Sequence, residues 1–412
     1  MGVGLSFVQR VNPAWFLAGA AFFLPIKPAP VNLLLALALV FTYASSSNWR
    51  VLAQLIQKWR VILLLVFVAY LLATFLYASN DSALYNDFLS KYGRFLLIPL
   101  LIPAFKSFDD RALVAKAFSL SMAITLVLSY LVWLKVDLSF LGVVSDGEYA
   151  IPSNPTVFKK HITHNFFMAI ALYFWLLGLV RNVQAMKSSG TRAGLWTILY
   201  ASLVTAALIN LFAMVDGRTG WVVFCVIPFA LGIQKYGLKG IGLGFVLSVV
   251  IMAATYFSID NVQNRIDKGF QEVSDFYSGA DQKSSVGERL MLQMSGWRAF
   301  LDSPVIGHGI GGIKSAVTPY VGRFGGEPFQ NPHNQYLLLL IQGGILGLGL
   351  YLAFIALAIQ GSYRSEWSAV HIAPVLLMFV AGNLLNSFHY DFSESVAFIL
   401  LISALGVSND HV

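Results

Sequence analysis

Long apolar runs separated by short polar turns make up most of this chain. An apolar run of about twenty residues is long enough to cross the hydrocarbon core of a bilayer as a helix. The pattern predicts an all-α polytopic membrane protein with about twelve transmembrane helices, some of them short. Pro99 and Pro103 are expected to kink or end the fourth helix. The expected spans are 12–26, 30–46, 60–78, 92–105, 112–134, 162–180, 195–215, 218–233, 237–257, 334–360, 368–388 and 392–407.

One long polar stretch, residues 258–332, interrupts this pattern. Within it, Gly287 to Asp302 places large apolar side chains near helical spacing, which predicts an amphipathic helix on the membrane or on the bundle. The serine–proline pair that follows is expected to end this helix. We therefore divide the chain into nine helices over 1–257, a partly helical loop domain, and three helices over 333–412.

The composition agrees with a membrane protein. Hydrophobic residues make up 57% of the chain and charged residues 11%, whereas a soluble protein carries about 25% charged residues. The single cysteine, Cys225, excludes an intrachain disulfide and is expected to be a small buried hydrophobe. A net charge of +7 on a soluble domain would suggest nucleic acid. Here the basic residues fall mainly in short loops, so we expect no nucleic-acid partner.

These basic residues divide unevenly between the two sides of the predicted bundle. The short loops on the side of the chain ends hold more lysine and arginine, as at Arg50, Lys58 and Arg60, than the opposite short loops. Because short cytoplasmic loops carry the excess of positive charge, both termini are expected in the cytoplasm. The loop 258–332 is then extracytoplasmic.

The end of this loop carries a side chain suited to chemistry. Asn331 is a good N-cap and Pro332 suits the first helical position, so His333 is expected on the first turn of the next helix. The positive end of the helix dipole favours the neutral imidazole, which can accept a proton from a hydroxyl nucleophile. The alternative is a histidine that only helps to cap a helix at the membrane surface.

Two arginines are candidates for binding an anion. Arg218 lies in the glycine-flanked turn 216–220 at the start of a helix, where backbone amides and a guanidinium together favour phosphate. Asp216 could instead pair with Arg218 and neutralise it. Arg289, on the predicted amphipathic helix, is either a second phosphate ligand or part of a solvated or lipid-facing surface.

Other polar residues gather at the expected outer ends of the helices. One group either faces the site or forms a collar for lipid headgroups; its members are Lys159, Lys160, His161 and His164. A second group crowds the last outer turn, where it orients His333, binds a sugar or caps helices. Its members are His389, Asp391 and Glu394.

Three further patterns carry less weight. Gly307, Gly309 and Gly312 match the letters of a dinucleotide fingerprint, but they follow a helix rather than a strand, so we expect a flexible turn. The histidines lack metal-ligand spacing, and we expect neither a metal nor a cofactor. The glycines within 343–349 indicate close helix–helix packing.

The sequence resembles the O-antigen ligase family of bacterial inner-membrane glycosyltransferases, which shares its core with O-antigen polymerases. The resemblance covers roughly residues 200–360. It rests on the segments Asp216–Gly220, Glu288–Leu290, Ser303–Gly309, Pro332–Leu337 and Gly343–Gly347. It implies a GT-C-type glycosyltransferase architecture in the inner membrane, with the active site on the periplasmic side.

The resemblance also implies a reaction. A polysaccharide on undecaprenyl diphosphate is transferred to a sugar hydroxyl of lipid A–core, with inversion and without a metal. Arg218 and Arg289 would bind the diphosphate, and His333 would act as the base. Further substrate contacts are expected from polar residues near the outer face. These are Lys160, His164, Asn334, Asp391 and Glu394.

Two alternative functions stay open on the sequence. An O-antigen polymerase uses the same donor but lengthens a growing chain. A lipid-linked sugar flippase or secondary transporter would place ionisable residues deep within its helices, whereas the candidates here gather at the expected outer ends.

Overall fold

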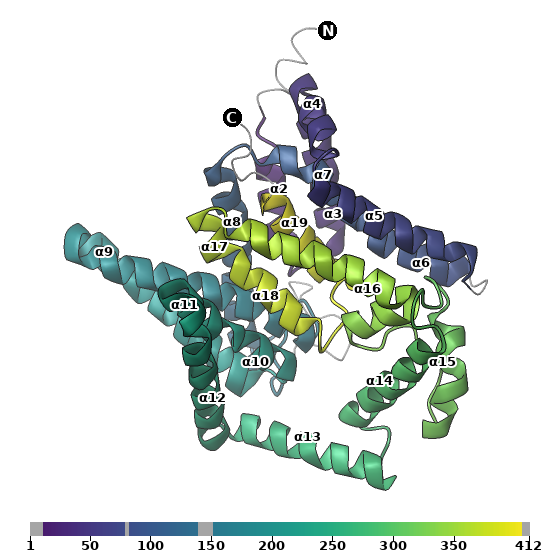
Figure 1. Ribbon diagram of the computed structural model, residues 1–412. Helices are drawn as coiled ribbons and strands as arrows, with labels where there is room; N and C mark the ends of the chain where they lie inside the picture. The colour runs from purple at the N-terminus through teal and green to yellow at the C-terminus, as the bar shows by residue number, and fades with distance from the viewer. Residues whose placement is uncertain (1–10, 79–81, 139–150, 406–412) are drawn as a thin grey trace.

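Helices dominate the structure of this chain (Figure 1). A computed structural model describes residues 11–78, 82–138 and 151–405, so the two chain ends, expected in the cytoplasm, lie outside the described residues. Within this part no β-strand forms beyond an isolated bridge between Ile151 and Asn154. The helices are α2 (Ala14–Phe23), α3 (Pro28–Tyr43), α4 (Ser46–Leu55), α5 (Trp59–Ala73), α6 (Ser82–Gly93), α7 (Leu97–Leu101), α8 (Phe108–Trp133), α9 (His161–Ile209), α10 (Arg218–Phe224), α11 (Val226–Tyr236), α12 (Gly240–Ser258), α13 (Asp260–Ser278), α14 (Ser285–Asp302), α15 (Ile313–Val321), α16 (Gln335–Ser362), α17 (Glu366–His371), α18 (Ala373–Gly382) and α19 (Phe392–Leu405). The all-helical class is confirmed.

The number of membrane crossings differs from the expected twelve. By length and composition, the described residues contain six helices able to cross a membrane, or up to seven if the bent pair α3 and α4 forms one span. Twelve spans are therefore not confirmed. Several apolar runs form only short helices, such as α2 and α19. The expected span 92–105 breaks into α7 between two 3₁₀ turns, because Pro99 and Pro103 cannot continue the helical hydrogen-bond ladder.

The helix α9 folds back on itself as a hairpin of two apolar arms. The apolar segments are His161–Met186 and Ala193–Met214. Gly178 of the first arm lies against Tyr200 of the second, and a Cβ added there would come within 2.6 Å of the tyrosine ring. This close approach agrees with the prediction of two adjacent spans at 162–180 and 195–215.

The polar stretch 258–332 is more helical than expected. The predicted helix over 287–302 is confirmed as α14, which ends at Asp302 before the serine–proline pair. The helices α13 and α15 were not predicted from the sequence. Figure 1 shows α13, α14 and α15 together at one end of the molecule, with α4 at the other.

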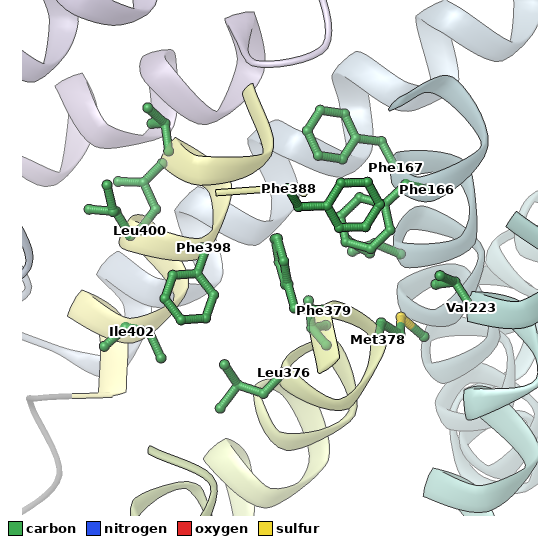
Figure 2. Close-up of a cluster of buried hydrophobic side chains, with 14 of the residues drawn as sticks. Phe166, Phe167, Val223, Leu376, Met378, Phe379, Phe388, Phe398, Leu400 and Ile402 are labelled. Carbon is green, nitrogen blue, oxygen red and sulfur yellow. The ribbon is translucent and has the colours of Figure 1, made fainter. Parts of the chain in front are cut away.

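Aromatic side chains fill the centre of the bundle (Figure 2). Phe166 of α9 lies 4.2 Å from Phe388 between ring centroids and 4.8 Å from Phe379 of α18. Phe379 in turn packs at 5.4 Å against Phe398 of α19. Because all four rings are almost completely buried, they fix the ends of α9, α18 and α19 that carry polar residues.

The helix α16 is broken in its middle. Gly344 has φ 61° and ψ −162°, so the first nine residues, 335–343, form a separate short arm. The break frees carbonyl groups at the end of this arm. The backbone N–H groups of His308 and Gly309 donate to the carbonyls of Ile341 and Gln342, at 2.8 Å each. The segment after α14 therefore caps the short arm.

The same segment, Pro304–Gly309, which we call the strap, also forms hydrogen bonds with the first residues after the break. The N–H of Ile345 donates to the carbonyl of Pro304 at 2.8 Å, and that of Leu346 to Val305 at 3.2 Å. The strap therefore supplies the backbone partners that a continuous helix would have provided. The expectation of a flexible turn here is wrong, because these backbone bonds hold the strap to α16.

Candidate functional site

The candidate base lies in the loop just before the short arm of α16. His333 has a left-handed backbone, φ 51°, and its N–H donates to the side-chain oxygen of Asn331 at 2.9 Å. The N-cap is Asn334, whose side chain accepts from the N–H groups of Tyr336 and Leu337 at 3.0 and 3.1 Å. The expectation that Asn331 caps the helix and that His333 lies on its first turn is wrong. Asn334 is the N-cap instead of Asn331 because its side chain accepts hydrogen bonds from two otherwise unpaired backbone N–H groups of the first helical turn.

The surroundings of His333 favour its neutral form. Burial lowers the pKa of this imidazole, and the positive charge of Arg289 lowers it further, against a smaller opposing effect of Glu288. The direction agrees with the sequence-based expectation, but the cause differs. Partial burial and a neighbouring guanidinium, rather than the position on a first helical turn, disfavour the imidazolium.

Arg289 links the histidine to the other arginine. Burial lowers the pKa of the Arg289 guanidinium, and the charge of Arg218 lowers it further. Glu288 opposes the shift. Since Arg289 also acts on the pKa of His333, the three side chains form one electrostatic group, although they come from α10, α14 and the loop before α16. Two neighbouring cations and a neutral imidazole make a setting that an anionic ligand would stabilise.

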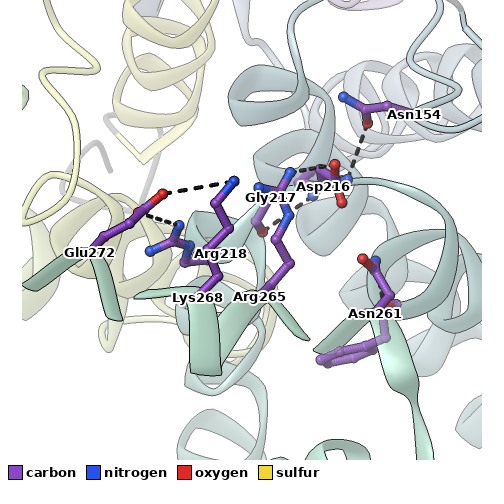
Figure 3. A network of polar contacts seen from close by, with 10 residues as sticks. Asn154, Asp216, Gly217, Arg218, Asn261, Arg265, Lys268 and Glu272 are labelled. Atoms are coloured by element: carbon purple, nitrogen blue, oxygen red, sulfur yellow. Dashed lines mark hydrogen bonds and ion pairs between the residues drawn. The ribbon is translucent and has the colours of Figure 1, made fainter. Parts of the chain in front are cut away.

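Arg218 is the first residue of α10 and is held from α13 (Figure 3). Its Nη2 lies 3.4 Å from Oε2 of the buried carboxylate of Glu272, which Lys268 also approaches at 3.9 Å. Asp216 forms its ion pair with Arg265. The alternative in which Asp216 neutralises Arg218 is therefore wrong. One third of the Arg218 side chain remains exposed, so the guanidinium can still reach a ligand.

Close packing explains the glycines around Arg218. A Cβ added at Gly217 would lie 2.1 Å from Nδ2 of Asn165, and one added at Gly220 would lie 2.6 Å from its Cβ. The Asn165 amide donates to the carbonyl of Gly217 at 3.3 Å. On the other side, Gly269 of α13 leaves room for the Arg218 guanidinium, since an added Cβ would approach Nη1 at 2.9 Å. The turn thus rests on α9 and presents Arg218 to α13.

The acidic residues expected near the site lie at the start of α19. Glu394 is buried in the first turn of α19, and Asp391 lies just before that helix. Burial raises the pKa of Asp391, while the charges of Lys91 and Lys160 lower it. Lys159 shows the reciprocal effect: burial lowers its pKa, and the charges of Glu394 and Asp391 raise it. These residues form a mixed-charge group near the N-terminus of α9.

The helix α6 adds residues to this group that were not predicted from the sequence. The Lys91 ammonium lies 2.6 Å from Asp87 and 3.0 Å above the ring of Tyr390. The Tyr390 hydroxyl is 3.1 Å from Asp87 and 3.3 Å from Gln330 in the loop before His333. The pairing of Asp87 with Lys91 four residues later was the available signal for a helix.

Two candidate histidines lie in the interior. His164 is buried, and its Nε2 is 2.9 Å from Oδ1 of Asn210. His389 is equally buried and lies 2.6 Å from the hydroxyl of Tyr351, with the amide of Asn383 at 3.4 Å. These contacts connect neighbouring helices. Because both side chains are buried, a substrate cannot reach them in this structure.

An apolar groove of about 750 Å³ runs beside the site. It lies between α14 and α16, and its walls include Leu290 and Asn334, the direct neighbours of Arg289 and His333. Met294, Trp297 and other apolar side chains continue it away from these residues. Its apolar walls suit a hydrocarbon chain, and Gln293 and Arg298 also line it.

Comparison with known proteins bears on the same segments. Residues 188–352 match the family described as O-antigen ligase, and this region contains Arg218, Arg289 and His333. Lys160, Asp391 and Glu394 lie outside it. No curated protein matches the chain. Among the described residues, no group of three or more histidine, cysteine, aspartate or glutamate side chains is arranged to hold a metal ion.

Proposed function

We propose that this chain is a member of the O-antigen ligase family, whose model matches residues 188–352, and that it is the ligase itself. In this proposal it transfers a polysaccharide from undecaprenyl diphosphate to a sugar hydroxyl of lipid A–core. The reaction takes place on the periplasmic side of a bacterial inner membrane, with both chain ends in the cytoplasm. The observation that carries the proposal is the family match over residues 188–352, the region that contains Arg218, Arg289 and His333.

The two arginines take the diphosphate. Breaking the bond between the anomeric carbon and the phosphate oxygen leaves negative charge on the carrier diphosphate, which Arg218 and Arg289 stabilise. Single donors of this kind contribute on the order of 3 kcal/mol. The ion pair with Glu272 fixes the direction of the Arg218 guanidinium before the donor binds, so less ordering is needed at the moment of reaction.

His333 takes the proton of the acceptor. The acceptor hydroxyl oxygen attacks the anomeric carbon from the face opposite the phosphate, which inverts that centre. Its proton moves to the neutral imidazole of His333, and the new glycosidic bond forms as the diphosphate leaves. A general base typically increases the rate by a factor on the order of 10²–10⁴.

The groove between α14 and α16 receives the polyprenyl chain of the donor. Two of its lining residues, Leu290 and Asn334, are the sequence neighbours of Arg289 and His333, near which the diphosphate would lie. Around the mixed-charge group, Lys160 and Asp391 contact the sugar parts of the substrates, while the buried Glu394 supports Asp391 from within. Asn334 caps the helix that follows His333. His164 supports the same end of α9 from within.

The test is transfer by the purified protein from carrier-linked polymer to purified lipid A–core, with EDTA present. We expect lipid A–core bearing polymer and free carrier diphosphate as products. Extension of the carrier-linked polymer itself, with lipid A–core unchanged, would identify a polymerase. Movement of carrier-linked sugar across vesicles with no glycosyl transfer would identify a transporter.

A further inference from the structure

A second groove lies between α5, α7, α16 and α19. It has a volume of about 160 Å³ and apolar walls, formed by residues such as Leu64, Phe354 and Ala358. Its rim carries Lys58, Arg60 and Arg364, which come from opposite sides of the groove. Among the described residues that line it, none is acidic.

The rim has the features of a membrane–water boundary. Trp59 is 55% exposed beside Lys58, and the Arg60 guanidinium lies 5.7 Å from the centre of its ring. Exposed tryptophans gather where lipid headgroups meet the hydrocarbon region. The preceding helix α4 turns away from α3 by 102° and carries exposed Trp49, as a helix lying along the membrane surface would.

The arrangement couples charge to an apolar cavity. Gly361 of α16 leaves room for the guanidinium of Arg60, since a Cβ added at this glycine would lie 2.8 Å from Nη1. Arg60 therefore lies over the groove, against α16. Basic pockets between transmembrane helices bind anionic lipid headgroups, and the apolar walls below would accept acyl chains.

We propose that this groove binds one anionic phospholipid, with its phosphate between Lys58, Arg60 and Arg364 and its acyl chains against α5 and α16. The inference is independent of the proposed ligase activity, because the groove shares no lining residue with the groove beside His333. The lipid would fasten α5 to the long arm of α16, and Tyr70 of α5 contacts α16 directly at its break.

Binding is measured by native mass spectrometry of the detergent-purified chain, titrated with phosphatidylglycerol or with phosphatidylcholine of the same acyl chains. We expect a clear preference for phosphatidylglycerol. Replacing Lys58 and Arg364 by glutamine should reduce this preference by about fivefold for each cation removed. Arg50→Gln on α4, which removes a cation outside the groove, serves as the matched control and should leave the preference unchanged.

A second variant tests the apolar part without altering charge. Ala358→Leu fills the groove and should weaken binding of phosphatidylglycerol while the rim cations remain. An excess of glycerol phosphate, which has a phosphate but no acyl chains, should not displace the lipid. Equal affinity for the two lipids, an undiminished preference in Lys58→Gln/Arg364→Gln, or displacement by glycerol phosphate would overturn the proposal.

Discussion

The phenol of Tyr70 on α5 donates a hydrogen bond of 2.7 Å to the carbonyl of Gly343, the last residue before α16 breaks. Tyr77 donates in the same way to the carbonyl of Ile306 in the strap, at 2.7 Å. The break is thus held from α5 as well as from the strap. Because the short arm of α16 begins at Gln335, two residues after His333, these contacts help to fix the place of the candidate base.

We predict that Gly344→Ala destabilises the protein by about 3 kcal/mol. The residue has φ 61°, and an added Cβ would lie 2.2 Å from the carbonyl oxygen of Val305, so both a strained backbone and a clash oppose alanine. The matched control is Gly349→Ala in the same helix, where nothing lies within 4 Å of the added atom. Thermal unfolding in detergent measures both variants. An equal melting temperature for the two would contradict the role of Gly344.

Replacing His333 by alanine should lower glycosyl transfer by about 10²–10⁴ while the protein still inserts and folds. Donor binding should persist, since the two arginines remain. The measurement is initial rate together with binding of carrier-linked polymer. Retention of the full rate in this variant would remove His333 from the role of base.

The rate should also report the environment of His333 through its pH dependence. A histidine acts as a base when it is neutral, and the pKa of His333 is lowered below its ordinary value. The midpoint of the acidic limb of the pH–rate profile should therefore lie below pH 6.5. Glu288 raises this pKa, and therefore Glu288→Gln should move the limb to still lower pH. A limb that moves upward, or that does not move, would argue against the assignment.

Arg218→Lys should reduce the rate by about 10²–10³, because lysine retains the charge but loses the planar fork that binds two phosphate oxygens. Arg323→Lys, at an exposed position in a 3₁₀ turn, is the control and should behave as the wild type. Rates measured at saturating acceptor decide the question. A near-normal rate for Arg218→Lys would show that a point charge is sufficient.

Asp391→Asn should raise the KM for lipid A–core several-fold with a smaller effect on the KM for the donor, since Asp391 lies with the lysines of the mixed-charge group rather than with the arginines. Steady-state kinetics with each substrate varied in turn provides the check. A change only in the KM for the donor would show that Asp391 contributes to binding of the donor and not of the acceptor.

The places of the candidate residues in the fold were largely predictable because these residues stand at boundaries between apolar and polar sequence. Arg218 begins α10 and Arg289 lies near the start of α14, as their positions in the chain indicate. The pairing of Arg218 with Glu272 was not predictable, since α13 was not expected. The N-cap was misplaced because Asn331 and Asn334 both have capping side chains, and only their geometry distinguishes them.

The interruption of α16 could not be read from the sequence. Residues 334–360 are a continuous apolar run, and the glycines within it also suit helix packing, as Gly343 and Gly347 do against Tyr70. What separates the two arms is a set of backbone hydrogen bonds to the strap. Patterns of side-chain hydropathy carry no information about such bonds, because every residue except proline offers the same N–H and carbonyl.

Because the contacts with α16 use main-chain atoms, the side chains of Val305 and Ile306 in the strap take no part in them. Val305 and Ile306 are 58% and 42% exposed, although their carbonyls serve α16 and α5. Substitutions at these two positions would change the exposed surface of the strap without removing the backbone hydrogen bonds that hold it to α16.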